Sequence, residues 1–251
     1  MDALYLEHAQ RARAALPGPY YTEVLALLQA ELRPRTYLEI GVASGKTIAL
    51  AAATTQAVGV DPDPDIRVPL GSNVRIYRQT SDELLGGGNG RELFGALPVD
   101  FAFIDGMHRF EFVLRDFAAA ERLAHREATI ALHDCYPLER RTAERVRTTV
   151  FWSGDCWRAV LALKKYRPDL AIDTIATAPT GLTLVRRLDP DSSVLAERMD
   201  RIVAEFLALD YAALDADKPG LLNLFPNDPS RIRALLAAGS RSACVSGKSP
   251  V

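Results

Sequence analysis

From residue 36 onward, short apolar runs alternate with amphipathic stretches. The apolar runs predict strands near 36–41, 57–61, 73–77, 100–105 and 128–133, and the amphipathic stretches predict helices near 45–54, 80–85, 109–124 and 155–166. Two further apolar runs, 171–175 and 182–185, predict neighbouring strands joined by a short connection. Alternation of this kind specifies a mostly parallel sheet covered by helices on both faces, so the fold class is α/β.

The two ends of the chain differ from this central region. Residues 3–32 carry apolar positions at helical spacing, and the break at 17–19 predicts two helices that cap one edge of a substrate cleft. A further helix is predicted over 190–209, residues after Tyr211 read as irregular, and 239–251 read as loose. The predicted divisions are an N-terminal helical cap (1–33), a core (34–189) and a C-terminal helix with an irregular tail (190–251).

Composition narrows the classes of function. The 251 residues are 48% hydrophobic, enough for one sizeable core, and 30 Lys plus Arg against 32 Asp plus Glu give a net charge of −2. This charge balance provides no overall electrostatic field that would attract nucleic acid or an acidic membrane, so we favour a small-molecule substrate. The N-terminus has no basic segment before an apolar one and no uncharged run approaches the ~20 residues of a membrane span, so we expect a soluble, cytoplasmic protein. The three cysteines form no C-x-x-C pair, which supports neither a disulfide framework nor a thiolate zinc site.

A glycine-containing loop follows the first predicted strand. Gly41 and Gly45 would let the backbone approach a ligand, and the next strand ends in Asp61, whose carboxylate can accept hydrogen bonds from both ribose hydroxyls. Asp61 follows the glycines by about twenty residues, as in nucleotide-binding α/β folds. Ala43 replaces the middle glycine of the dinucleotide fingerprint, which weakens a nicotinamide or flavin interpretation. The pattern therefore indicates a cofactor with an adenosine half.

A second group of polar residues follows two later strands. Asp105 and His108 come directly after the strand near 100–105, and His133 and Asp134 end the strand near 128–133. Ligands bind at the carboxyl edge of an open α/β sheet, so these side chains should meet Gly41 in one crevice. Two carboxylates repel each other unless a cation or proton lies between them. We therefore expect a divalent metal, and magnesium fits oxygen ligands best.

The E-x-G-x-x-x-G loop followed by an acidic strand end resembles motif I and its acidic partner in class I S-adenosylmethionine (SAM)-dependent methyltransferases. The resemblance implies a Rossmann-like doubly wound sheet of about seven strands, mostly parallel with a final antiparallel hairpin strand, plus N- and C-terminal helical additions. It also implies that the loop faces the methionine and sugar parts of SAM, that Glu39 braces the loop, and that adenine lies near the end of the third strand. The implied cofactor-binding residues are Glu39, Gly41, Ala43, Ser44, Gly45, Lys46, Thr47, Asp61, Thr80, Ser81 and Asp105.

The stretch Ile104-Asp105-Gly106-x-His108, followed by a helix and by Leu132-His133-Asp134, resembles the macrocin- and mycinamicin-type sugar O-methyltransferases and the cephalosporin-hydroxylase-like group. The similarity covers roughly residues 36 to 187. It implies that Asp105 and Asp134 ligate magnesium and that His108 is the general base for methylation of a sugar hydroxyl. His133 stands where those enzymes have an acidic ligand. Three alternatives follow: the metal has one fewer oxygen ligand, it is held through an imidazole, or it is a softer ion such as manganese.

The chemistry explains why these residue types belong together. A sulfonium methyl group is already activated, so the enzyme must align a hydroxyl and remove its proton. Sugar hydroxyls are poor acids, and a bound metal lowers their pKa while a neutral histidine accepts the proton.

Structural alternatives stay open for each of these residues. His108 could cap the following helix, His133 could hydrogen-bond the backbone, Asp134 could be a helix N-cap, and Asp105 could be an ordinary loop acid. Thr80 and Ser81 could start a helix instead of contacting adenine, and the aromatic segment 151–158 could stack on a sugar or anchor a helix. The nearby arginines could receive an anionic substrate, although a solvated helix face is the favoured interpretation: Arg140, Arg141, Arg145 and Arg147.

Two functional alternatives also stay open. His108, His133 and a nearby aspartate could form the two-His-one-carboxylate iron site of an oxygenase. The chain could also bind SAM without catalysis and act through partners. We expect a small-molecule or oligosaccharide hydroxyl substrate, no nucleic acid, no membrane span and, from the extra terminal helices, a homodimer.

Overall fold

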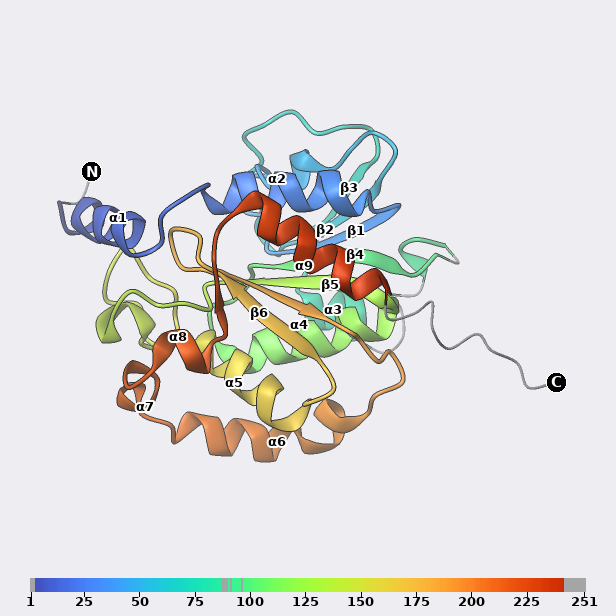
Figure 1. The fold of residues 1–251 in the computed structure, drawn as a ribbon. Coiled ribbons are helices and arrows are strands. Elements are labelled where there is room, and N and C mark those ends of the chain that lie inside the picture. The colour runs from blue at the N-terminus through green and yellow to red at the C-terminus, as the bar shows by residue number, and fades with distance from the viewer. Residues whose placement is uncertain (1–2, 87–89, 91, 96, 242–251) are drawn as a thin grey trace.

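A mixed sheet forms the centre of the molecule (Figure 1). The computed structural model describes residues 3–86, 90, 92–95 and 97–241. Within these residues eight strands follow the order β3-β2-β1-β4-β5-β7-β6-β8, one strand more than the seven predicted. Only β7 runs antiparallel to its neighbours in this described sheet, as the predicted final hairpin requires. The strands are β1 (Thr36–Ile40), β2 (Gln56–Val60), β3 (Val74–Tyr77), β4 (Val99–Ile104), β5 (Ala124–His133), β6 (Ala171–Ile175), β7 (Leu182–Arg186) and β8 (Leu224–Phe225).

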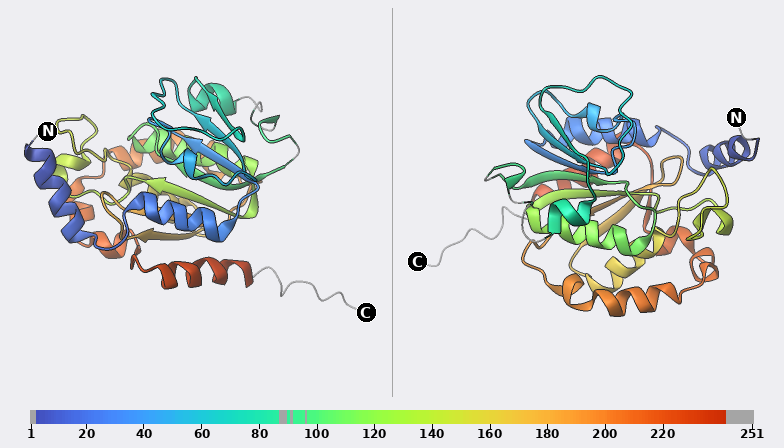
Figure 2. Two further views of the ribbon diagram at one scale, coloured as in Figure 1. Left: turned by 90° about the horizontal axis from the view of Figure 1, so that it is seen from above. Right: turned by 180° about the vertical axis from the view of Figure 1, so that it is seen from behind.

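Helices cover both faces of this sheet, as Figures 1 and 2 show. One face carries α2 (Tyr21–Leu32) and α9 (Pro229–Arg241), which contact each other, and the opposite face carries a larger layer of helices. This larger layer comprises α3 (Ser81–Leu85), α4 (Phe110–Leu123), α5 (Trp157–Tyr166) and α6 (Val194–Leu207). The remaining helical elements are α1 (Ala3–Ala15), α7 (Tyr211–Asp215), α8 (Lys218–Leu221) and the short 3-10 helices η1 (Ile48–Leu50) and η3 (Arg140–Ala143).

Side chains of β1 alternate between two hydrophobic cores. Leu38 and Ile40 belong to the core beneath α4, whereas Tyr37 packs in the core beneath α2. All five residues of β1 are buried because helices cover both faces, which explains why the strand reads as an uninterrupted apolar run apart from Glu39.

The helix predicted near 45–54 is wrong. Only the short η1 forms there, because Ala43 and Gly45 adopt left-handed backbone angles, with φ of 45° and 81°. The carbonyls of Ala43 and Ser44 then accept hydrogen bonds from the backbone amides of Asp65 and Arg67. The loop therefore pairs with the segment after β2 instead of continuing as a helix.

The prediction that residues after Tyr211 are irregular is also wrong. Asp210 and Asp217 cap α7 and α8 by accepting hydrogen bonds from backbone amides, and β8 then pairs with β6 at the edge of the sheet. On α9, Ile232 is buried in the core beneath α2. Pro219 and Gly220, residue types typical of turns, thus lie inside the capped helix α8, and the C-terminal segment completes the fold. Residues 242–251, which include Cys244, lie outside the described residues.

Two predictions from the sequence concern membrane-spanning helices and the cysteines. No helix among the described residues has the length and apolar character that crossing a membrane requires. Cys135 and Cys156 are buried free thiols, so neither of them forms a disulfide bond.

Gly41 holds the end of β1 against the end of β4. Its φ is +88°, and a Cβ atom placed there would lie 2.1 Å from the carbonyl oxygen of Asp105. We expect Gly41→Ala to lower the free energy of unfolding by about 3 kcal/mol or more, because it adds backbone strain and a backbone clash. Urea unfolding measures this change. Gly86→Ala is the matched control, since Gly86 has a φ of −68° and open space around its Cβ position, and a comparable loss there would contradict the explanation.

Candidate active site

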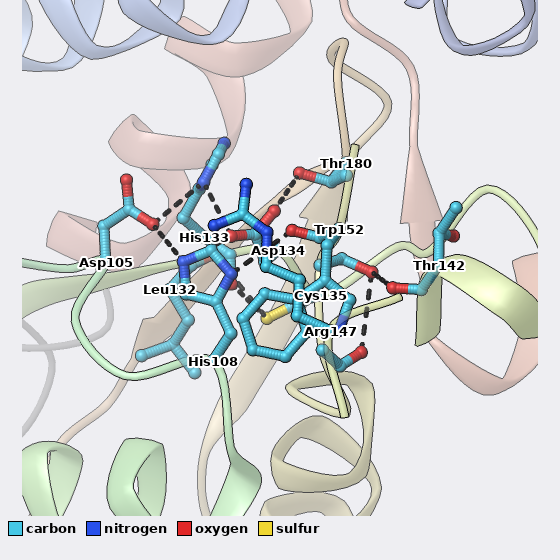
Figure 3. A network of polar contacts seen from close by, with 12 residues as sticks. Asp105, His108, Leu132, His133, Asp134, Cys135, Thr142, Arg147, Trp152 and Thr180 are labelled. Atoms are coloured by element: carbon cyan, nitrogen blue, oxygen red, sulfur yellow. Dashed lines mark hydrogen bonds and ion pairs between the residues drawn. The ribbon is translucent and has the colours of Figure 1, made fainter. Parts of the chain in front are cut away.

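Four ionisable side chains meet at the carboxyl edge of the sheet (Figure 3). Parallel pairing of β4 with β5 places Ile104 opposite Leu132, so the residues that follow them, Asp105 and His133, lie side by side. Asp134 comes next in the chain, and His108 reaches the group from the loop between β4 and α4. The predicted convergence of Asp105, His108, His133 and Asp134 is therefore observed.

Acids and imidazoles alternate within this cluster. His133 Nδ1 lies 3.1 Å from Asp105 Oδ1 and 3.4 Å from Asp134 Oδ2. His108 Nε2 lies 3.1 Å from Asp134 Oδ2 and 3.7 Å from Asp105 Oδ1. The other oxygen of Asp134 accepts a hydrogen bond of 2.5 Å from Thr180 Oγ1. Each imidazole thus faces both carboxylates.

The tautomer of His108 follows from its second nitrogen. His108 Nδ1 lies 3.3 Å from the carbonyl oxygen of Trp152, and since a carbonyl only accepts, Nδ1 must carry the proton. The Trp152 ring stacks on the imidazole at 5.1 Å and 17°, and Gly154 permits the approach, because a Cβ there would lie 1.9 Å from the His108 carbonyl oxygen. In the neutral ring, Nε2 therefore presents a lone pair towards Asp105 and Asp134.

Burial and charge oppose each other within the cluster. Burial of Asp134 disfavours its charged form, but the neighbouring His108 and His133 and the hydrogen bond from Thr180 outweigh this and lower its pKa to about 2. For His133, burial favours the neutral ring, yet Asp105 and Asp134 raise its pKa well above the ordinary value. Asp134 is consequently a carboxylate over the whole neutral range.

Asp105, His108 and Asp134 form a donor set for a metal ion. Each offers one ligand atom, and these atoms lie within 4.8 Å of one another. Adjacent ligands of a divalent cation bonded at about 2.1 Å lie roughly 3 Å apart, so the separations of 3.1 and 3.7 Å around His108 Nε2 fit a cation. Two oxygens with an imidazole nitrogen suit manganese as well as magnesium.

His133, which the sequence assigned to the metal, lies differently from these three residues. Its Nδ1 faces the same two carboxylate oxygens, while its Nε2 is buried and finds no hydrogen-bond partner among the described residues. The Tyr21 ring packs on the imidazole with a centroid separation of 4.3 Å. His133 is therefore placed to brace both carboxylates.

Three structural alternatives for these residues are wrong. The N-terminal amide of α4 at Phe110 is capped by Asp155 Oδ1 at 3.0 Å, so His108 does not cap this helix. After Asp134 the next helical element is η3, so Asp134 is not its N-cap. The ring nitrogen of His133 that has partners contacts carboxylates and not the backbone.

A cavity of about 600 Å³ opens beside the cluster. Its floor includes Ala43 of the glycine loop and the four ionisable residues, and its walls come from α1, from Trp152 and its neighbours, and from the loop before β7. Within the aromatic segment, Trp152 thus faces the cavity, whereas Trp157 is buried and anchors α5. The prediction that the N-terminal helices border a cleft is confirmed for α1.

Glu39 braces the glycine loop through its neighbours. Its two carboxylate oxygens accept hydrogen bonds from Tyr37 Oη at 2.6 Å and from Thr47 Oγ1 at 2.7 Å. Burial raises the pKa of Glu39 to about 8, although both hydrogen bonds oppose this shift. Lys46, between these residues in sequence, is exposed.

Stability should therefore depend on pH through Glu39. The folded protein keeps the proton of the Glu39 carboxyl group at pH values where the unfolded chain has lost it. The stability that Glu39 contributes is therefore fully present below pH 4.5 and is lost as the pH rises to about 8. As the pH rises from 4.5 to about 8, the free energy of unfolding of Glu39→Gln should increase by a few kcal/mol relative to that of wild type, since one pKa unit corresponds to about 1.4 kcal/mol. Urea unfolding of both proteins at several pH values measures the difference, with exposed Glu127→Gln as the control. A constant difference across the range would contradict the argument.

Asp61 is tied to the same loop. Its Oδ2 accepts hydrogen bonds from the amides of Val42 and Ala43 at 2.9 and 2.8 Å, and its Oδ1 accepts one from Asp63 at 2.9 Å. A carboxylate offers about four acceptor positions, so one remains for a ribose hydroxyl where the sequence suggested two. Gly45 has a φ of +81°, and a Cβ atom placed there would lie 3.3 Å from the Ile66 side chain, so the protein's own backbone and packing explain this glycine as they explain Gly41.

The predicted adenine-contacting residues start a helix. Thr80 is the N-cap of α3, accepting from the Glu83 amide while its own amide donates to Glu83 Oε2. Ser81 Oγ donates to the buried carboxylate of Asp116. Their helix-start role is confirmed, and adenine contact stays a prediction.

The arginine group belongs to the scaffold. Arg145 binds Glu111 and the fully buried Asp155, and Arg140 binds Asp210. Arg147 donates to the carbonyls of Thr149 and Val150. Arg140, on η3, has an exposed side chain, as the interpretation as a solvated helix face predicts, whereas Arg145 and Arg147 lie outside the helices of the described residues.

The sequence did not predict that residues of α1 and Thr180 line the site. Tyr5, Gln10 and Arg13 line the cavity, although they lie about a hundred residues from the cluster. No local motif marks them. Their sole signal is the helical spacing of the N-terminal segment.

Comparison with known proteins supports the fold. Residues 38–135 match the family model of a methyltransferase domain. No curated protein sequence matches the chain significantly. The eight-stranded sheet and the helices on its two faces form an α/β Rossmann-like fold around this match.

Several solved structures share this fold. The cofactor-bound protein Rv0187 from MTB is 20% identical, with 74% of this chain and 90% of that chain covered and a TM-score of 0.51. The O-methyltransferase TomG from Streptomyces achromogenes, in complex with SAM, is 16% identical over 75% and 91% of the two chains, with a TM-score of 0.50. An O-methyltransferase from Bacillus cereus, in complex with SAH, is 18% identical over 74% and 90%, with a TM-score of 0.50. These identities establish likeness of fold alone.

Proposed function

We propose that this chain is a SAM-dependent O-methyltransferase that methylates a sugar hydroxyl with the help of a divalent cation and of His108 as general base. The observation that carries the proposal is the position of His108 Nε2, 3.1 Å from Asp134 Oδ2 and 3.7 Å from Asp105 Oδ1, at the cavity floor beside the glycine loop. The match of residues 38–135 to a methyltransferase domain supports the same reaction.

The residues around the loop fit SAM. The cavity reaches Ala43 and Asp105, so a methyl donor held by the loop would face the ionisable cluster. Asp61 keeps one acceptor position for a ribose hydroxyl, and Glu39 keeps the loop in shape through Thr47. SAM would supply a methyl group already activated on a sulfonium. Solved structures of similar fold in complex with SAM or SAH support this cofactor.

Asp105 and Asp134 are the residues that we propose hold the cation. Asp105 Oδ1 and Asp134 Oδ2 both face His108 Nε2, at 3.7 and 3.1 Å, so a cation bound between them would have two anionic ligands. The cation, Mg²⁺ or Mn²⁺, would lower the pKa of a bound hydroxyl. His133 then keeps both carboxylates in position through Nδ1.

His108 is placed to accept the hydroxyl proton at Nε2. The Trp152 carbonyl fixes its protonated Nδ1, and the Trp152 ring fixes its plane, so little reorganisation is needed before proton transfer. Asp134, 3.1 Å from Nε2, would stabilise the imidazolium that forms. The resemblance of the Asp105-to-His108 stretch to sugar O-methyltransferases and the aromatic wall at Trp152 support a sugar as the acceptor.

The test is transfer of a labelled methyl group from SAM to a panel of glycosides, with Mg²⁺, Mn²⁺ or a chelator. We expect an O-methyl product and S-adenosylhomocysteine (SAH) with either cation and strongly reduced transfer in chelator. Full transfer in chelator would refute the metal role. Oxygen- and 2-oxoglutarate-dependent turnover would instead indicate the oxygenase, and SAM binding without any transfer would indicate a non-catalytic protein.

A further inference from the structure

One wall of the cavity is built by α1, through residues between Tyr5 and Arg13. This helix lies at one end of the sheet beside the loop that contains Trp152 (Figure 2). His8 and Tyr5 pack against Phe151, with ring centroids 5.7 and 6.3 Å apart, and Arg11 forms a 2.6 Å ion pair with Glu139. Several contacts therefore fix α1 as a wall of the site.

The two arginines of α1 have different surroundings. Arg11 is used to hold the helix through Glu139, whereas Arg13 lines the cavity and forms no ion pair with any residue that the structure describes. Its guanidinium lies over the Tyr20 ring, 5.7 Å from the centroid. Arg13 is also the single lysine or arginine among the described residues lining this cavity. An exposed cation is thus directed at the space where the acceptor would lie.

A second polar group accompanies Arg13. Gln10 lies three residues earlier on α1, on the same side of the helix, and lines the same cavity. Tyr20 also lines the cavity, with the guanidinium of Arg13 over its ring. The cavity therefore has the ionisable cluster on its floor and, on the wall that α1 builds, an amide donor and a guanidinium without an ion pair among the described residues.

Resting on the proposed function, we propose that the acceptor is an anion, a hydroxyl compound whose carboxylate or phosphate group is held by Arg13 and Gln10 while its hydroxyl faces His108. A guanidinium matches planar carboxylate and phosphate oxygens with two parallel hydrogen bonds. The anionic group would then lie at the α1 wall while the hydroxyl reaches the cluster on the cavity floor. Trp152 and Tyr20 then contact the body of the molecule between these ends.

The experiment screens matched hydroxyl compounds by thermal shift, with SAH and Mn²⁺ present. Each compound is tested as the neutral glycoside, as its carboxylic acid and as its phosphate, so that the two anionic groups are distinguished. We expect the anionic members to raise the Tm more than their neutral partners. Calorimetry then gives the Kd of the best anionic member for wild type and variants.

For Arg13→Gln we expect about 10-fold weaker binding of the anionic compound and unchanged binding of the neutral one. Arg13→Lys should restore part of the affinity because it keeps the charge but not the planar fork. Arg201→Gln on α6 is the matched control and should bind like wild type. Equal binding of neutral and anionic members to wild type, or undiminished binding of the anion to Arg13→Gln, would overturn the proposal. SAH titration of the same proteins tests the proposed function separately. Absence of SAH binding would refute the cofactor, whereas the comparison of anionic and neutral compounds tests the role of Arg13.

Discussion

Asp134→Asn should weaken Mn²⁺ binding by about 100-fold or more and slow methyl transfer by about 1,000-fold, because it removes one of two anionic ligands from the cation. The substitution is chosen for the backbone at this position, where φ is 58°. Asparagine tolerates left-handed angles, whereas most side chains do not. The amide can still accept from Thr180 and can donate to the lone pair of His108 Nε2, so the fold should survive.

Calorimetric titration with Mn²⁺ and a methyl-transfer assay measure these two effects. Asp173→Asn is the control, since Asp173 is a partly buried acid on β6 that pairs with Arg186. Unchanged Mn²⁺ affinity in Asp134→Asn would mean that the two carboxylates do not form the cation site.

Replacing His108 should separate proton transfer from binding. We expect His108→Asn to lower kcat by about 100- to 10,000-fold, the range that general bases contribute, while SAH binding stays unchanged. Mn²⁺ affinity should fall much less than in Asp134→Asn, because the base is not one of the two anionic ligands. Single-turnover assays and calorimetry provide the measurements.

His125→Asn is the matched control for this substitution. His125 lies on β5, where it pairs with Asp100 at 3.2 Å. A loss of Mn²⁺ affinity in His108→Asn as large as that in Asp134→Asn would place His108 among the metal ligands, as its distances to both carboxylates also permit. The general-base role would then have to be abandoned.

The central sheet was predictable because parallel strands buried on both faces read as apolar runs. The meeting of Asp105 with His133 was predictable for a related reason, since both follow neighbouring parallel strands at their carboxyl ends. These inferences need only local patterns and the general geometry of the fold.

The errors arose where distant segments determine the local structure. The helix predicted at 45–54 gives way to η1 because the segment after β2 pairs with the carbonyls of Ala43 and Ser44. In the C-terminal region, β8 is a strand of two residues whose sole sequence signal is apolar, and it forms because the edge of β6 accepts it. Neither interaction is encoded in a short window of sequence.

The sequence also could not predict the roles of individual polar atoms. The Trp152 carbonyl that fixes the proton on His108 lies 44 residues away, so no spacing could reveal it. Arg11 and Arg13 look alike in sequence, yet only Arg11 has an acidic partner among the described residues. The distinction between a side chain that holds the fold and one that faces the cavity requires the structure.

The proposed function requires that a methyl donor and a cation occupy one edge of the sheet. A crystal structure with SAH and Mn²⁺, with anomalous data at the manganese edge, tests this most directly. We expect an anomalous peak between Asp105 and Asp134 and the SAH sulfur on the same side, above the glycine loop at Ala43. SAH bound elsewhere, or manganese absent from these carboxylates at saturating concentration, would contradict it.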